Sequence, residues 1–348
     1  MSPFYENIFL LLGTIIGAGI FSLPIALKQT GWLFFLITIT GLSLLLAQTD
    51  SLFREIVESI PEKHQLPGYA KIILGDKISK LSTFLLLVST FGALLAYLII
   101  GGDFLGNVLR ISSWYGSIIF FAAIFLITFF AGKKIEEFDV LFTVIKIVLI
   151  VGIIVSCLGP LTGFAIRFIP AVGNNPLGGY GSILFALTGI SIIPELKKTK
   201  HIHKSILIAE IIVLVFYLLF SVMLYPYLSA DSFVFKSLLF DITGVFTILS
   251  PYLMLSMVGN DLLVKDLKVN KNHSYIMMLG IPILLFLVGF TSFMNVISFT
   301  GGVFLGSMVL IVTFMYKKKF PHKHTLVIPI IQFVFIVGVI LEIWQFVF

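Results

Sequence analysis

The sequence predicts an all-α protein that crosses a membrane many times. Of its 348 residues, 59% are hydrophobic and only 11% are charged, whereas a soluble domain carries about 25% charged residues. Apolar runs of near-membrane length recur along the whole chain, and a run of about 20 residues crosses a hydrocarbon core about 30 Å thick. The net charge of +6 is therefore expected in loops at a membrane surface, and nucleic acid is not an expected partner.

Eleven apolar runs are predicted as spans. Their approximate bounds are 8–28, 32–52, 78–108, 114–131, 139–159, 180–195, 205–226, 241–262, 275–292, 298–316 and 326–347. The stretch 67–75, between the second and third spans, is typical of a short interfacial helix. No basic leader precedes the first run, so we expect that run to remain as a span. The lone cysteine, Cys157, excludes an intrachain disulfide.

The distribution of lysine and arginine predicts the orientation. With the N-terminus in the cytoplasm, 18 of the 23 basic residues fall in inside loops. Outside segments then hold only Lys28, Arg110, Arg167 and Lys236, and Lys146 lies within the fifth span. Cytoplasmic loops are enriched in basic residues, so the chain is predicted to be N-in and C-out, integral to the cell membrane, with the lipid bilayer as its partner.

The spans divide into two halves of opposite topology. Residues 8–159 hold five spans and residues 180–316 hold five more, while the helix at 326–347 lies outside this symmetry. An odd number of spans in each half means that the first span enters from inside and the sixth from outside. We therefore expect one transmembrane domain, 1–348, built from two inverted repeats and an extra helix.

The first span carries an internal interruption, the stretch Leu12–Pro24 with Gly13, Gly17 and Gly19. Glycine weakens a helix by roughly 1 kcal/mol and proline by about 3 kcal/mol, and freed backbone groups survive in a membrane only when they face protein or a wet cavity. Unwinding at residues 17–19 frees N–H groups at the positive end of the following half-helix, which suits a carboxylate. The alternative is a close-packing face between helices.

The sixth span has a matching interruption, Phe185–Glu195, with Gly189 and Pro194. Unwinding at residues 187–189 frees carbonyl groups, which suit an ammonium. Interrupted spans at corresponding places in inverted halves indicate a binding site near the bilayer midplane. Donors on one span and acceptors on its symmetry mate match a zwitterion, so the paired interruptions favour broken helices over simple packing.

Three of the charged residues in or near apolar segments are candidates for function. Lys146 either snorkels to the cytoplasmic surface or is buried against the first span, where desolvation would make it a proton carrier; the sequence leaves both open. Asp103 lies toward the outer end of the third span and is a candidate gate or an ordinary hydrogen-bonded aspartate. Glu195 lies where the sixth span meets the cytoplasm and is a candidate gating ion pair or a solvated helix end.

No catalytic or metal motif is apparent. All six histidines fall in predicted cytoplasmic loops or at their edges, and the His201-x-His203 pair lacks the further ligands that a metal site needs. No nucleophile and base converge, and no phosphate-binding glycine loop is present. The sequence therefore predicts neither an enzyme, a metal site nor a cofactor.

Several stretches resemble the amino acid–polyamine–organocation superfamily, especially its amino acid/auxin permease and hydroxy/aromatic amino acid permease branches. The similarity lies in the first-span glycine stretch, in segments of spans three and six, and at the junction of spans nine and ten; these are 13–24, 96–105, 185–195 and 295–302. The resemblance implies a LeuT-type fold of two inverted five-helix repeats and the uptake of amino acids, often driven by protons. It also implies that a lysine on the fifth helix takes the place of sodium, and Lys146 is similar in setting.

These observations predict a proton-coupled symporter of neutral or aromatic amino acids. The residues predicted to bind substrate are Thr14, Ile16, Gly17, Ala18, Gly19, Tyr97, Phe185, Ala186, Leu187, Thr188, Gly189 and Tyr252. Lys146 is predicted to carry the coupled proton, and Asp103 and Glu195 to act in gating. Ser250, Tyr252 or Ser256 on the eighth span could also shape the pocket. The alternatives are sodium coupling through first-span carbonyls and eighth-span hydroxyls, or a receptor of the same fold that binds an amino acid without moving it. The sequence leaves the oligomeric state open.

Overall fold

The computed structural model describes residues 2–131, 135–158, 169–228, 238–323 and 326–347. Within these residues the chain is almost entirely helical, as the sequence predicts. The predicted connection at 159–179 and the basic residues Lys133, Lys134, Arg167 and Lys236 lie wholly or partly outside the described residues.

The first predicted span is two helices rather than one. Helix α1 (Pro3–Ile15) ends just before the glycine stretch, and α2 (Gly19–Thr30) begins after it. The two helices are bent by 61° at the break. Ile16 leaves the helix with an extended backbone, at φ −76° and ψ 90°. The predicted break in this span is therefore confirmed.

The remaining predicted spans coincide with helical segments, several of them interrupted. The segments are α3 (Trp32–Glu58), α4 (Leu66–Leu74), α5 (Asp76–Leu109), α6 (Ser113–Ala131), α7 (Ile135–Leu158), α8 (Tyr180–Leu187), η3 (Ile190–Glu195), α9 (Ile202–Leu224), η4 (Tyr225–Tyr227), α10 (Leu238–Asp261), η5 (Leu262–Asp266), α11 (Lys271–Leu287), α12 (Phe293–Phe299), η6 (Thr300–Leu305), α13 (Gly306–Lys319) and α14 (Val327–Val347). The ninth span ends earlier than predicted, because the chain turns at Gly289 with φ +112°, a conformation that glycine adopts readily. The tenth span contains a π-helical stretch, η6, which the sequence did not predict.

Length and composition make this a multi-pass membrane protein. Six helices among the described residues are long and apolar enough to cross a membrane, and the bent α1–α2 pair makes a seventh. Four shorter apolar segments lie at 113–128, 143–157, 180–195 and 271–287. The count of eleven spans, the five-plus-five symmetry and the orientation stay predictions.

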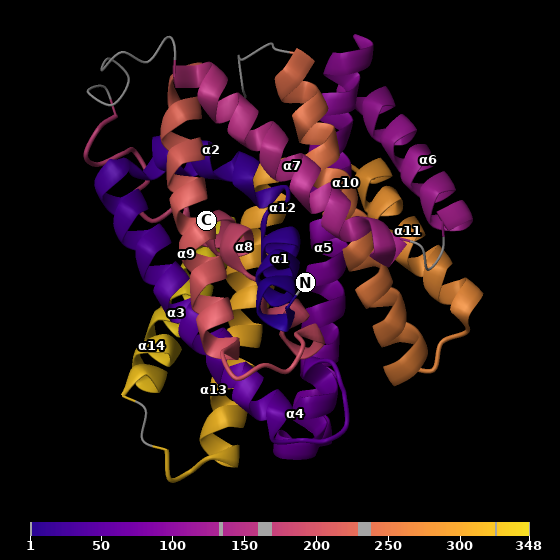
Figure 1. The fold of residues 1–348 in the computed structure, drawn as a ribbon. Coiled ribbons are helices and arrows are strands. Elements are labelled where there is room, and N and C mark those ends of the chain that lie inside the picture. The colour runs from indigo at the N-terminus through magenta and orange to yellow at the C-terminus, as the bar shows by residue number, and fades with distance from the viewer. Residues whose placement is uncertain (1, 132–134, 159–168, 229–237, 324–325, 348) are drawn as a thin grey trace.

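The two interrupted spans lie at the centre of the molecule. In Figure 1, α1 and α8 occupy the middle of the view, with α3, α9 and α14 on one side and α5, α10, α6 and α11 on the other. The contacts agree: α1 packs on α9 and α7, and α2 packs on α8 and α9. The helices around them therefore form a frame that holds the two breaks together.

Polar contacts link neighbouring segments at the end of the bundle where α4 lies, which we call the α4 end. Asn7 and Lys197 exchange two hydrogen bonds of 2.8 Å, from the Asn7 amide to the Lys197 carbonyl and from the Lys197 N–H to the Asn7 side-chain oxygen. The Lys197 ammonium also pairs with Glu6 at 2.5 Å. These contacts tie the start of α1 to the chain just beyond η3.

Candidate functional site

The breaks in the first and sixth spans lie against each other. A Cβ atom added to Gly19 would lie 2.5 Å from the Cα of Ala186, and one added to Gly189 would lie 2.9 Å from Cγ1 of Ile15. Real Cβ atoms do not approach other atoms so closely, so side chains at these positions would force the two segments apart. The glycines are therefore required for the close approach of the two broken helices.

The break in the first span exposes backbone donors. Among the described residues, the N–H groups of Gly17, Ala18 and Gly19 have no backbone acceptor. They lie at the N-terminal end of α2, where the helix dipole favours negative charge. The N–H of Ile16 differs, because it donates to the Leu12 carbonyl at 3.0 Å. The break thus offers three free donors to an anion.

The break in the sixth span exposes backbone acceptors. Helix α8 ends at Leu187, and Thr188 has an extended backbone. The carbonyls of Leu187 and Thr188 accept no hydrogen bond from the described residues. They lie at the C-terminal end of α8, where the dipole favours positive charge. The two breaks together offer donors and acceptors to a zwitterion.

Lys146 is buried beside the first break. Its side chain is 0% exposed, and its ammonium donates to the carbonyls of Gly13 at 2.6 Å and Ile16 at 2.8 Å. The structure thus has the buried arrangement rather than the snorkelling one. The ammonium, which comes from α7, therefore lies at the carbonyl end of α1. The role of Lys146 in proton coupling stays a prediction.

A tyrosine that the sequence analysis did not single out joins the two breaks. The hydroxyl of Tyr217 on α9 lies 2.8 Å from the carbonyl oxygen of Ile15 and 3.0 Å from that of Ala186. Its side chain is 0% exposed. The Ala186 carbonyl is therefore already hydrogen-bonded, which leaves Leu187 and Thr188 as the acceptors for a ligand.

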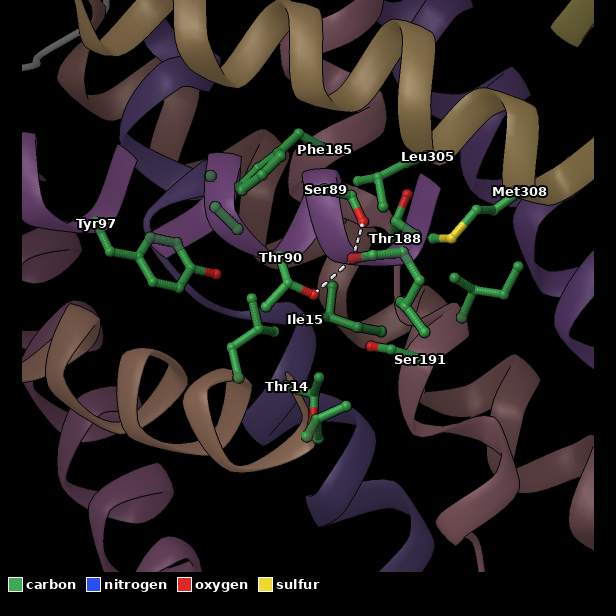
Figure 2. Close-up of a pocket in the computed structure, with 16 residues that line it drawn as sticks. Thr14, Ile15, Ser89, Thr90, Tyr97, Phe185, Thr188, Ser191, Leu305 and Met308 are labelled. Atoms are coloured by element: carbon green, nitrogen blue, oxygen red, sulfur yellow. Dashed lines mark hydrogen bonds between the residues drawn. The ribbon is translucent and has the colours of Figure 1, made fainter. Parts of the chain in front are cut away.

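A cavity of about 60 Å³ lies beside the breaks. At 10–15 Å³ of such volume for each water, it holds roughly four to six water-sized positions. Figure 2 shows Tyr97 and Phe185 toward one end, Met308 toward the other, and the hydroxyls of Ser89 and Thr90 between them. Among the described residues, no charged side chain lines it. The lining residues are Thr14, Ile15, Gly19, Leu86, Ser89, Thr90, Ala93, Tyr97, Phe185, Thr188, Ile190, Ser191, Leu255, Val258, Leu305 and Met308.

Five of the predicted substrate-binding residues line this cavity, namely Thr14, Gly19, Tyr97, Phe185 and Thr188. The others are not lining residues but belong to the two breaks that adjoin the cavity: Ile16, Gly17 and Ala18 to the first, and Ala186, Leu187 and Gly189 to the second. The Tyr252 ring is 6.5 Å from the Tyr97 ring, between centroids, and its buried hydroxyl has no partner among the described residues.

The two predicted gating residues lie apart from the cavity. Asp103 is near the end of α5 and interacts with Ser113 at the start of α6. Glu195 lies at the α4 end, where it accepts from the Lys63 ammonium at 2.6 Å and from the Gln65 amide at 3.1 Å. The partner of Glu195 is thus Lys63, whereas the nearby Lys197 pairs with Glu6.

Several residues that line the cavity were not predicted from the sequence. Ser89 and Thr90 donate their hydroxyls to the Leu86 carbonyl on α5, and Ser191 follows the second break. Small hydroxyl residues in an apolar helix commonly bond to their own backbone, so their type alone does not identify them. Ser89 and Thr90 precede Tyr97 by eight and seven residues on the same helix, and this spacing could have indicated that they share a face with Tyr97.

The described residues contain no cluster of three or more histidine, cysteine, aspartate or glutamate side chains that could hold a metal ion. The polar groups of the site are backbone N–H and C=O groups, hydroxyls and one ammonium. Such a set suits a small organic zwitterion.

Two broken helices that cross inside a frame of apolar helices define a membrane transporter of the LeuT fold. The family model described as "Transmembrane amino acid transporter protein" matches residues 3–227. The chain belongs to this family, which places it among transporters of amino acids rather than among enzymes.

Solved structures agree on the fold. Over 98% of both chains, the protein is similar to MhsT in complex with L-phenylalanine, with a TM-score of 0.71 and 14% identity. It is also similar to a histidine-to-alanine mutant of the Eremococcus coleocola manganese transporter, over 97% of this chain and 84% of that one, with a TM-score of 0.69 and 12% identity. No curated protein sequence matches.

Proposed function

We propose that the protein is a proton-coupled symporter that takes up neutral or aromatic amino acids by alternating access. The observation that carries the proposal is the pairing of two breaks, one with free donors and one with free acceptors. The substrate carboxylate meets the N–H groups of Gly17, Ala18 and Gly19, assisted by Thr14. The ammonium meets the carbonyls of Leu187 and Thr188.

The cavity supports a substrate with an uncharged side chain. Its wall combines apolar groups with hydroxyls and holds no acid or base, among the described residues, to pair with a charged side chain. Its present volume admits a few heavy atoms, so an aromatic substrate, such as the phenylalanine bound by MhsT, requires the wall to open. A manganese substrate is not favoured, because carboxylates are typical protein ligands of this ion and no acidic side chain is among the described residues of the wall.

Lys146 supports coupling to protons rather than to sodium. Its ammonium already occupies two carbonyls of the first break, and a second cation there would be repelled. When Lys146 gives up its proton, these carbonyls lose a charged donor and the break is free to rearrange. Sodium coupling through the same carbonyls and the hydroxyls of α10 is the alternative.

The proposed architecture has two inverted repeats, five spans in each, and α14 as an eleventh span. The basic residues support N-in, C-out topology in the cell membrane, since the α4 end carries Lys63, Lys197 and Lys323. With this orientation the α4 end is the cytoplasmic side, and its polar contacts hold together the segments on the inner side of the bundle.

The test uses purified protein in liposomes. A thermal-shift screen of the twenty standard amino acids first identifies a ligand, because binding to the folded state raises its apparent stability. Uptake of that amino acid should then accelerate when the outside is made acidic and should not require sodium. Lys146→Ala should abolish this acceleration, and unchanged acceleration would rule out its coupling role. Binding without flux would instead support a receptor.

A further inference from the structure

Two acidic side chains are buried together outside the substrate cavity. Asp50 on α3 is 0% exposed and Glu210 on α9 is 1% exposed, and the two carboxyl groups interact electrostatically. None of their four oxygens accepts a hydrogen bond of good geometry from the described residues, although the Ser43 side chain faces Glu210. Buried polar atoms of a native protein are almost always paired, so the oxygens of Asp50, which have no such neighbour among the described residues, indicate a missing ligand.

The groups around the pair do not neutralise two negative charges. Tyr217, two turns along α9, is the titratable neighbour of Glu210 on that helix. Arg54, one turn along α3 from Asp50, directs its guanidinium to Glu58 and to the backbone carbonyls of Ile193 and Leu196. Ionised carboxylates in a membrane interior need a cation or several donors, and like charges disfavour joint ionisation. At least one carboxyl of the pair therefore carries a proton.

A proton fits this location better than a metal ion. Neither Asp50 nor Glu210 lines the cavity beside the breaks, so a hydrated ion held in that cavity would not contact either carboxyl group. Hard cations take six or more oxygen ligands, and no group of three acidic or imidazole side chains occurs among the described residues. A proton needs neither the volume nor the ligands.

The pair adjoins the second break. An oxygen of Asp50 lies 3.8 Å from the position that a Cβ of Gly189 would take. One turn further along α3, Arg54 donates to the carbonyls of Leu196 at 2.8 Å and Ile193 at 3.4 Å. Asp50 therefore lies beside the start of η3, the segment that follows the break, and Arg54 is hydrogen-bonded near its end.

Arg54 has an acidic residue one turn away on each side. It now pairs with Glu58 at 3.2 Å through Nε, while Asp50 lies four residues in the other direction. Either carboxylate is in reach of a guanidinium at this spacing. The ionisation of Asp50 thus decides whether Arg54 is drawn away from η3.

We propose that Asp50 and Glu210 form a proton-binding site, separate from Lys146, that controls closure of the α4 end. With the proton bound to a carboxylate oxygen, the pair leaves Arg54 on the η3 carbonyls and the end stays closed. When the O–H bond breaks and the proton leaves to solvent, the buried charge attracts the guanidinium and η3 is released. This inference goes beyond the proposed function, because it requires neither a particular substrate nor a role for Lys146.

Infrared difference spectra of the native protein test the proton directly. Between acidic and alkaline buffers, the C=O stretch of a protonated carboxylic acid should be lost. Asp50→Asn or Glu210→Gln should remove or displace this signal, while Asp76→Asn, the same chemical change at an exposed position, should leave it intact. A signal that is unchanged in both pair variants would overturn the proposal.

Thiol labelling tests the coupling to closure. In a Cys157→Ser background, Ser191→Cys places one thiol within η3 and in the cavity wall. The labelling rate rises with pH in any case, because the thiol ionises. Release of η3 should raise the rate by a further factor of about ten, which is a typical size for coupling between two sites. Asp50→Asn should remove this rise, and Glu210→Gln serves if Asp50→Asn does not fold.

Two outcomes would contradict the proposal. An equal rise in Asp50→Asn shows that the pair does not control η3, and a response to sodium at fixed pH shows a cation site instead. Lys146→Ala should retain the pH response of labelling even where it abolishes proton-driven uptake. Failure of this inference is therefore distinguishable from failure of the proposed function.

Discussion

The hydroxyl of Tyr217 lies 2.8 Å from the carbonyl oxygen of Ile15, the last residue of α1. The same hydroxyl lies 3.0 Å from the Ala186 carbonyl in α8. A phenol has one proton to donate, so the two carbonyls compete for it or share it. One side chain of α9 therefore joins both broken helices, and a movement of either break changes the balance between the two hydrogen bonds.

Tyr217→Phe should destabilise the protein by about 1–3 kcal/mol, because it leaves buried carbonyls without a donor. Thermal unfolding in detergent measures the loss. Tyr252→Phe is the matched control, since that hydroxyl is equally buried and has no partner among the described residues. The control should unfold at the same temperature as the wild type or higher. Equal losses in the two variants would show that the Tyr217 bridge contributes nothing.

Lys146→Arg should separate the charge of this residue from its ability to release a proton. A guanidinium keeps the positive charge and donates to carbonyls, but it does not deprotonate in proteins. The variant should fold and bind substrate in a thermal-shift assay, yet its uptake should no longer respond to a pH gradient. Proton-driven uptake at the wild-type rate in Lys146→Arg would mean that another group carries the proton.

Gly19→Ala should prevent the two breaks from packing together. Its new Cβ would lie 2.5 Å from the Cα of Ala186, a backbone atom that cannot rotate away. Substrate binding and uptake should be lost. Gly41→Ala, in the middle of α3, meets nothing within 4 Å and should instead stabilise the helix by roughly 0.5–1 kcal/mol. The contrast tests whether the close approach of the two breaks, rather than glycine content in general, matters for transport.

The sequence contained enough to place the breaks but not the residues that join them. Glycine and proline within apolar runs have a strong physical meaning in a membrane, so α1, α2, α8 and η3 were predictable. Tyr217 was not, because a tyrosine in an apolar span has no pattern that distinguishes a bridging hydroxyl from a packing ring. Its role depends on the position of α9 between the two breaks, which is a property of the assembled bundle.

The burial of three acidic side chains could not be predicted from the sequence either. Asp50, Glu210 and Glu342 lie within a few residues of predicted span ends, where interfacial exposure is the usual state. The structure instead buries all three, and Glu342 accepts a hydrogen bond from the N–H of Gly181 at 3.1 Å. The α3 helix runs from Trp32 to Glu58, beyond its predicted end at 52, so Asp50 lies deeper than predicted. Helix lengths and packing, rather than residue type, determine this burial.

The contacts at the α4 end differ in strength, because one is a buried pair of hydrogen bonds and another is an exposed ion pair. Asn7 is 0% exposed and exchanges two hydrogen bonds with the backbone of Lys197. The Lys63 and Glu195 side chains are 63% and 35% exposed, and exposed ion pairs contribute only about 0–1 kcal/mol.

Asn7→Ala should therefore open the α4 end far more than Glu195→Gln does. The loss of two buried hydrogen bonds of about 1 kcal/mol each should increase labelling of Ser191→Cys by roughly tenfold or more, since about 1.4 kcal/mol corresponds to a factor of ten. Glu195→Gln should change it less than about threefold, and that small effect should vanish at high salt because exposed charges are screened. A larger effect of Glu195→Gln would make the ion pair, rather than the buried amide, the principal contact that keeps this end closed.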